Sequence, residues 1–99
     1  MTKKIRVIQS SLAKKGFVAD DTGHHIYYRF FIGGKRTDVY TFFSHGDVEI
    51  HGGRINQTAK QLRLDKDKFL ELIDCHMDES AYTKLLLDGG HIELPEFLR

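Results

Sequence analysis

Two adjacent histidines, His24 and His25, open an aromatic segment that also carries Tyr27 and Arg29. An imidazole titrates near neutral pH, so it can remove a proton from a substrate without the help of a metal ion. A guanidinium can pair with phosphate through two N–H groups, and a phenol ring can stack on a nucleobase. Each residue alone is equally well explained as an ordinary strand residue. Together these residue types suit an RNA-binding surface on which an imidazole could act as a base.

The period of this segment assigns its side chains to two faces of a strand, because alternate strand residues point in opposite directions. The more apolar set should face the core, and it consists of His24, Ile26, Tyr28, Phe30 and Ile32. The other set should face solvent, and it consists of His25, Tyr27, Arg29 and Phe31. His24 stands at the first strand position, where the pleat constrains it least. Both histidines therefore remain candidates for the catalytic base.

Apolar periodicity and chain-breaking residues predict the elements that hold this strand in place. Gly16 is expected to end a first helix, and the pair Gly33-Gly34 suits a tight hairpin. The expected order is a helix over residues 3–15, a short strand at 17–18, a turn at 20–23, strands over 24–32 and 35–43, a polar loop over 44–53, and a helix over 54–62.

This α-β-β-β-α order predicts an α+β fold with a three-stranded antiparallel sheet. Both helices are expected on one face of the sheet, so that the other face is left open. An uncovered, partly aromatic sheet surface of this kind is typical of double-stranded-RNA-binding domains, although a fold alone does not determine function.

The chain beyond residue 63 differs in charge and adds further helices. Residues 1–63 hold eleven Lys and Arg against five Asp and Glu, whereas residues 64–99 hold four against nine. Asp65 and Asp78 are suitable N-caps for two additional helices, and the tail HIELPEFLR is expected to be an edge strand or a disordered end. The basic front half is expected to meet an anion, and the acidic rear half to shield it or to meet a different partner.

Length and composition indicate one small domain without disulfides. The 99 residues include a single cysteine, Cys75, so no intrachain disulfide can form. The chain has no apolar run long enough to span a membrane, and its start, MTKKIRVIQ, lacks the apolar core of a signal peptide. We therefore expect a cytoplasmic protein without membrane association.

The six histidines invite comparison with metal sites. Neither the i, i+4 helical spacing nor the C-x-x-C spacing that preorganises zinc occurs among them and Cys75. We therefore expect no metal site and no cofactor, and Cys75 is expected to serve packing.

Several short motifs follow one another over residues 5–73. AKKGF, TGHHIYYRF, FFSHG, EIHGGRINQTAKQLRL and DKDKFLELI occur in this order, and they resemble the HicA-type toxins, small endoribonucleases of bacterial toxin–antitoxin pairs. The matching positions are Gly16-Phe17, His24, His45, Gly53 and Gln61-Leu62. That family usually has Gly-Ser before its catalytic histidine, where this chain has Thr22-Gly23. His24 falls on the catalytic position, and His25 remains the alternative.

The resemblance implies a HicA-like domain over residues 1–74, with an acidic helix and tail over 75–99 that packs on or extends it. It also implies cleavage of mRNA by a histidine general base without metal, and a HicB-type antitoxin as partner. We expect Arg29 or Lys35 to stabilise charge on the reacting phosphate, and His45 or His25 to act as general acid. The RNA-binding residues are predicted to be Tyr27, Arg29, Lys35, Arg36, His45 and Arg54.

Two other functions fit the same sequence. A non-catalytic RNA-binding module of this fold would bind RNA with a strong dependence on salt and would cleave nothing. A regulatory protein-interaction domain would instead use the acidic rear half, with an exposed apolar patch around Leu85, Leu94 and Phe97.

Overall fold

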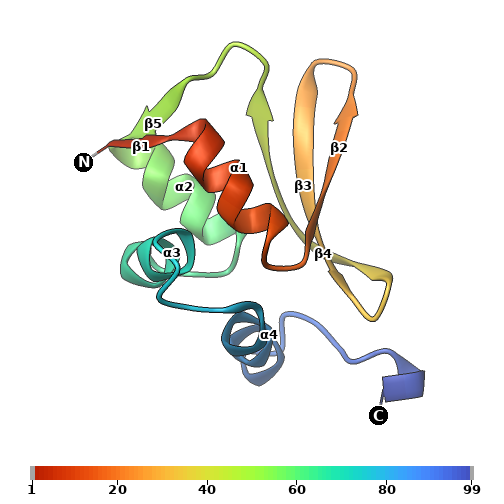
Figure 1. Ribbon diagram of the computed structural model, residues 1–99. Helices are drawn as coiled ribbons and strands as arrows, with labels where there is room; N and C mark the ends of the chain where they lie inside the picture. Colours follow the sequence, from red (N-terminus) through yellow and green to blue (C-terminus); the bar gives the residue numbers. More distant parts are fainter. Residues whose placement is uncertain (1, 99) are drawn as a thin grey trace.

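The computed structural model describes residues 2–98, in which most strands precede most helices (Figure 1). The elements are β1 (Thr2–Lys4), α1 (Ile5–Ala13), β2 (Phe17–Thr22), β3 (His25–Ile32), β4 (Lys35–Ser44), β5 (Glu49–His51), α2 (Gly53–Gln61), α3 (Lys66–Ile73), α4 (Glu79–Asp88) and a 3-10 turn (Glu96–Leu98).

Strands β2, β3 and β4 form an antiparallel sheet in the order β2-β3-β4, which confirms the predicted three-stranded meander and the α+β class. Gly33 and Gly34 both have positive φ, of 58° and 80°, at the hairpin between β3 and β4. Two consecutive residues with positive φ are what a type I′ hairpin turn requires, and glycine adopts this conformation without strain.

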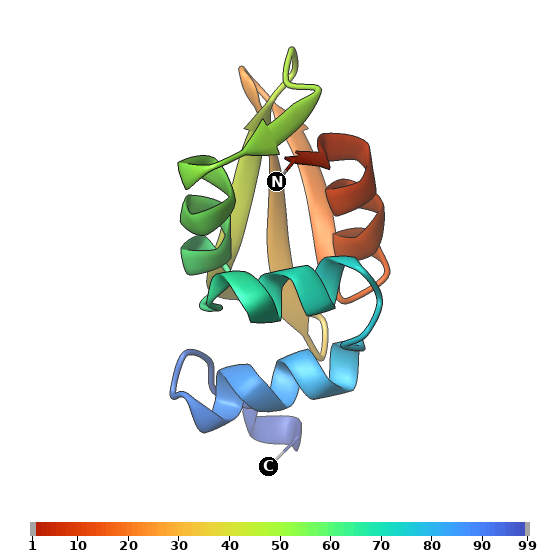
Figure 2. The ribbon, with the colours of Figure 1, turned by 90° about the vertical axis from the view of Figure 1, so that its left-hand side faces the viewer.

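Helices α1 and α2 lie on the same face of this sheet (Figure 2). Apolar side chains from both helices and from the sheet form one buried core, and its fully buried members include Ile8, Leu12, Phe30, Phe43 and Ile55. The opposite face of the sheet has no helix over it in the described part of the chain (Figure 1). The sheet therefore has one buried face and one open face, as predicted.

Helix α4 packs against the core at the end of the sheet where β3 turns into β4. Its Tyr82 is fully buried, with ring centroids 5.7 Å from Phe17 and 5.3 Å from Phe30. The Tyr82 hydroxyl donates a hydrogen bond of 2.8 Å to the carbonyl oxygen of Leu62. Side chains beyond residue 74 thus share the core of the preceding residues, and the division into 1–74 and 75–99 stays a prediction.

Both predicted N-caps of the rear half are confirmed. The Asp65 carboxylate accepts a hydrogen bond of 2.8 Å from the backbone N–H of Lys68 at the start of α3. The Asp78 carboxylate accepts one of 2.8 Å from the backbone N–H of Ala81 at the start of α4. Each bond satisfies a donor that the first turn of a helix leaves unpaired.

The prediction of a helix from residue 3 is wrong at its start. Residues 2–4 form β1, which pairs with β5 in the segment predicted as a polar loop, with Lys3 opposite Ile50. Ile50 is only 1 % exposed, and the backbone N–H of Ile5 donates to the carbonyl oxygen of Val48 over 2.8 Å. β1 and β5 thus form a second, two-stranded sheet, which is stabilised by the burial of Ile50. Local periodicity does not predict this sheet, because its two strands are distant in the sequence.

The predicted turn at residues 20–23 is also wrong. Strand β2 continues to Thr22, which pairs with His25, and the turn consists of Gly23 and His24. Gly23 has a φ of 71°, which glycine adopts readily. Asp20 and Asp21 therefore lie in a strand despite their turn propensity, and their carboxylates pair with Arg29 and His45, respectively.

The tail beyond α4 contains no strand within residues 91–98. Ile92 and Pro95 are buried, and a 3-10 turn follows at Glu96–Leu98. The expectation of an edge strand is wrong, and the buried Ile92 belongs to the common core.

Candidate functional site

An aromatic row crosses the open face of the sheet, which we define by His25, Tyr27 and Arg29 of β3 and Tyr40 and Phe42 of β4. Tyr27 is paired with Phe42 and Arg29 with Tyr40. Ring centroids lie 5.1 Å apart for His25 and Phe42, 5.6 Å for Tyr27 and Phe42, and 6.0 Å for Tyr27 and Tyr40. Tyr40 is 45 % exposed. Such a row offers adjoining planar surfaces on which unpaired bases can stack.

Arg29, at one end of this row, is held by two contacts. Its guanidinium carbon is 4.6 Å from the centroid of the Tyr27 ring, and its Nη1 lies 2.5 Å from the Asp20 carboxylate. The cation–π contact and the ion pair together orient the guanidinium. A phosphate that binds Arg29 must therefore compete with Asp20.

Lys35 and Arg36 are exposed at the opposite end of the face from the histidines, at the turn between β3 and β4. We call this the hairpin end. Strand β3 has eight residues, and at about 3.3 Å per residue its two ends are roughly 23 Å apart. The expectation that Lys35 stabilises a phosphate reacting at His24 or His25 is therefore wrong. Arg36 instead borders a shallow depression of about 440 Å³ that also includes Tyr27 and Tyr40.

The other end of the face gathers three histidines that are separated in sequence. His24 is exposed in the turn after β2, His25 is half-buried on the open face opposite Ser44, and His45 follows Ser44 directly. Nε2 of His45 lies 3.0 Å from Oδ1 of Asp21. We call His24, His25, His45 and Asp21 the histidine end.

The members of the histidine end point to different sides of the sheet. His25 shares the open face with Phe42. Asp21 is paired with Ile26, whose side chain packs against the core, so Asp21 and its partner His45 lie at the helix-covered side of the same edge. Imidazoles are therefore available on both sides of one sheet edge.

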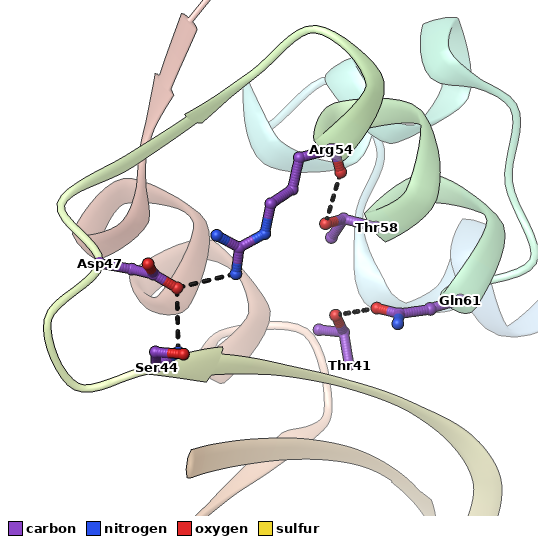
Figure 3. A network of polar contacts seen from close by, with 6 residues as sticks. All are labelled: Thr41, Ser44, Asp47, Arg54, Thr58 and Gln61. Carbon is purple, nitrogen blue, oxygen red and sulfur yellow. Dashed lines mark hydrogen bonds and ion pairs between the residues drawn. The ribbon is translucent and has the colours of Figure 1, made fainter. Parts of the chain in front are cut away.

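A polar network behind this edge holds the loop that carries His45 (Figure 3). The Asp47 carboxylate accepts hydrogen bonds of 3.0 Å from the backbone N–H of Ser44 and 2.7 Å from the Arg54 guanidinium. The Arg54 guanidinium, and then the Ser44 N–H, hold the pKa of Asp47 below its usual value. Arg54 therefore positions the loop from the first turn of α2, and it does not lie on the open face where the RNA contacts are predicted.

The same network ties the end of β4 to α2. Oγ1 of Thr41 donates to Oε1 of Gln61 over 2.6 Å, and Oγ1 of Thr58 donates to the carbonyl oxygen of Arg54 over 2.9 Å (Figure 3). These bonds connect the loop, the strand and the helix, so that the position of His45 depends on α2.

The structure thus unites some of the predicted residues and separates others. His24, His25 and His45 share one end, Tyr27 and Arg29 lie on the face, Lys35 and Arg36 lie at the far end, and Arg54 lies behind the loop. Sequence reasoning missed Asp21, Tyr40, Phe42 and Asp47. The period of two in β4 already places Tyr40 and Phe42 on one face, whereas no local signal pairs Asp21 with His45.

Two other predicted features can be located. Leu85 is 38 % and Phe97 71 % exposed, on α4 and the tail, away from the histidine end. Cys75 is exposed, so the prediction that it serves packing is wrong.

Within residues 2–98, no group of three or more His, Cys, Asp or Glu side chains is placed to hold a metal ion. The same residues include no helix of the length and apolar character that crossing a bilayer requires.

Comparison of the chain with protein-family models, with curated proteins and with solved structures gave no match. The resemblance to HicA toxins therefore rests on the sequence motifs, without support from these comparisons.

Proposed function

We propose that this protein is a metal-independent endoribonuclease of the HicA type, which binds mRNA on the open face and cleaves it at the histidine end. The observation that supports this most is the location of three histidines at one end of an uncovered aromatic face. Two helices on one face of a three-stranded meander also suit a double-stranded-RNA-binding-like architecture.

Binding uses the aromatic row. Unpaired bases stack on Tyr27, Tyr40 and Phe42, a contact that is worth about 1–3 kcal/mol per base in proteins that bind single strands. Arg29 exchanges its ion pair with Asp20 for a phosphate, and Arg36 holds the backbone at the hairpin end. Because these contacts are electrostatic and stacking interactions, binding depends on salt and tolerates many sequences.

Cleavage uses the 2′-hydroxyl of RNA as nucleophile. A histidine removes the proton of this hydroxyl, the oxygen attacks phosphorus, and the bond from phosphorus to the 5′-oxygen of the next nucleotide breaks. The leaving 5′-oxygen takes a proton from a second histidine. The products are a 2′,3′-cyclic phosphate and a 5′-hydroxyl, and no metal takes part.

His45 is the second histidine in this scheme. The Asp21 carboxylate lies 3.0 Å from Nε2 of His45 and orients the ring, so that in the acid form, which carries protons on both nitrogens, Nδ1 gives its proton to the leaving 5′-oxygen. The general base is His24 or His25. The HicA motif places His24 at that position, whereas ring contacts with Phe42 and Tyr27 hold His25 on the face where RNA binds.

The test is cleavage of a mixed single- and double-stranded RNA by purified protein in EDTA. We expect cleavage with cyclic phosphate ends, and loss of cleavage with retained binding in either His24→Ala or His25→Ala, which identifies the base. An RNA that stays intact with the parent protein would contradict the proposal.

The aromatic row favours a second candidate, the non-catalytic RNA-binding module, since Tyr27, Tyr40 and Phe42 can bind bases without the histidines. That module would bind RNA equally well after substitution of His24 and His25 and would leave it uncut. Binding without cleavage in the assay above distinguishes it.

A HicB-type antitoxin that covers the histidine end in the cytoplasm is the partner that fits the nuclease. We expect expression of the chain alone to arrest bacterial growth, and His25→Ala/His24→Ala to relieve that arrest. Growth arrest by the double variant would instead indicate an effect of binding, or of the exposed Leu85 and Phe97.

A further inference from the structure

A pocket of about 380 Å³ opens beside His45, between the start of α1 and the end of β4. Its lining combines apolar side chains, Ile26 and Val48, with the polar side chains of Lys4, Arg6 and Gln9. The volume lies in the range of about 300–1,000 Å³ that is usual for small-molecule sites, and a mixture of apolar walls and a few polar groups is typical of them.

The pocket lies across the sheet edge from the aromatic row. Ile26 faces the core side of β3, and His45 is shared by the pocket and the histidine end. His25 stands on the other side of the same edge. An RNA strand that extends from the aromatic row past the histidines therefore reaches this pocket next.

The charges of the pocket suit an anion. Lys4 and Arg6 are exposed, and within residues 2–98 neither forms an ion pair with a carboxylate, whereas Lys3, Arg29 and Arg54 each do. Among the lining residues that the structure describes, Asp47 is the one acid, and its carboxylate is already engaged by Arg54 and by the Ser44 N–H. Two unpaired cations at one rim attract phosphate.

We propose that this pocket is a nucleotide subsite, which holds the base and phosphate of the RNA nucleotide adjoining the cleaved bond. This inference rests on the proposed nuclease function for the identity of the bound strand. Ile26 and Val48 contact the base, Gln9 offers donors and an acceptor to its edge, and Lys4 and Arg6 bind the phosphate. The RNA then crosses the sheet edge, and the bond to be cleaved lies against the histidines between two anchored nucleotides.

Two kinds of variant test the pocket by kinetics. Lys4→Glu/Arg6→Glu reverses the two cations, and Lys14→Glu/Lys84→Glu reverses two exposed lysines elsewhere as a control of equal charge. Gln9→Trp fills the pocket without a change of charge, and Ser10→Trp places the same ring on the neighbouring exposed residue of α1. We expect each pocket variant to raise KM by about tenfold or more relative to its control, because a change of this size corresponds to the loss of roughly one charge-assisted or stacking contact.

A second measurement does not require cleavage. In a nuclear magnetic resonance titration of the parent protein with AMP, and separately with inorganic phosphate, we expect the largest amide shifts at Lys4, Arg6, Ile26 and Val48. AMP shifts that persist in Gln9→Trp, or that lie only on the open face, would overturn the subsite. Phosphate shifts without AMP shifts would overturn the part of the inference that concerns the base.

The two experiments separate the subsite from the proposed function. Cleavage by the parent with a KM that changes equally in pocket variants and controls would overturn the subsite and leave the nuclease intact. An intact RNA together with AMP shifts at the pocket would support a nucleotide site and contradict the nuclease.

Discussion

The two ends of the open face are held in place by different forces. At the histidine end, ion pairs and hydrogen bonds of Asp21, Asp47 and Arg54 position exposed groups. At the hairpin end, the sheet is backed by the buried ring of Tyr82 against Phe30. Polar contacts near the surface contribute little to stability, whereas buried rings contribute much. Substitution of the polar positioning groups should therefore alter the reaction at the histidine end, whereas substitution of the buried rings should alter folding at the hairpin end.

The largest effect is expected from removal of the ring behind the hairpin end. Tyr82→Ala should lower the free energy of unfolding by about 3–5 kcal/mol, because it leaves a cavity beside Phe17 and Phe30 and an unpaired carbonyl oxygen at Leu62. Urea unfolding measures this, with exposed Tyr40→Ala as the matched control. A loss below about 1 kcal/mol would show that α4 is not part of the common core.

Removal of the oriented histidine should affect the reaction and leave the fold intact. His45→Ala should reduce cleavage about a hundredfold or more, since proton transfer typically contributes that factor, with an unchanged midpoint of urea unfolding. Asp21→Asn, which keeps the shape of the side chain, should have a smaller effect in the same direction. If His76→Ala, at a histidine remote from this edge, reduced cleavage equally, the comparison of the two ends would fail.

The charged residues of the hairpin end should affect binding alone. Lys35→Ala/Arg36→Ala should weaken RNA affinity and lower the slope of log affinity against log salt by roughly one to two units, as expected for the loss of two phosphate contacts. The turnover at saturating RNA should not change, because these residues lie about 23 Å from the histidines. A reduced turnover would place the reaction closer to the hairpin end.

The smallest effect concerns the pH dependence of the polar network. Because the pKa of Asp47 is lower in the folded chain than in the unfolded chain, this carboxylate stabilises the fold above about pH 4. That contribution is lost as the pH falls through the folded pKa. Asp47→Asn should therefore be less stable than the parent at pH 7, and the difference should be smaller at about pH 2. A difference of equal size at both values would contradict this role of Asp47.

Regular patterns made much of the fold predictable from sequence. The alternation of side chains from His25 to Phe30 in β3 and the two capping aspartates, Asp65 and Asp78, depend on neighbouring residues only, and these were correctly predicted. The assignment of His24 to the core-facing set was wrong, because His24 lies exposed in the turn before β3, and the pairing of β3 with β4 shifts register between Arg29 and Phe31. The pairing of β1 with β5 was not, because two strands of three residues each carry no period and form only when Ile50 is buried.

The candidate site was predictable in its residue types more than in its arrangement. His25, Tyr27 and Arg29 share a face because a strand alternates, and that could be read directly. The approach of His45 to Asp21, and of Arg54 to Asp47, joins segments separated by turns whose geometry the sequence does not specify. The separation of Lys35 from the histidines, by contrast, could have been predicted, because the expected strand and the Gly33-Gly34 hairpin already place Lys35 at the far end of that strand.

The most direct test of the account compares the two ends in one experiment. Cleavage of a single RNA in EDTA is measured for the parent, for His24→Ala/His25→Ala and for Lys35→Ala/Arg36→Ala, each at saturating RNA and with affinity determined separately. The account predicts that the histidine variant binds RNA normally and loses turnover, while the lysine–arginine variant binds weakly and keeps it. Equal loss of turnover in both variants, or none in the histidine variant, would contradict it.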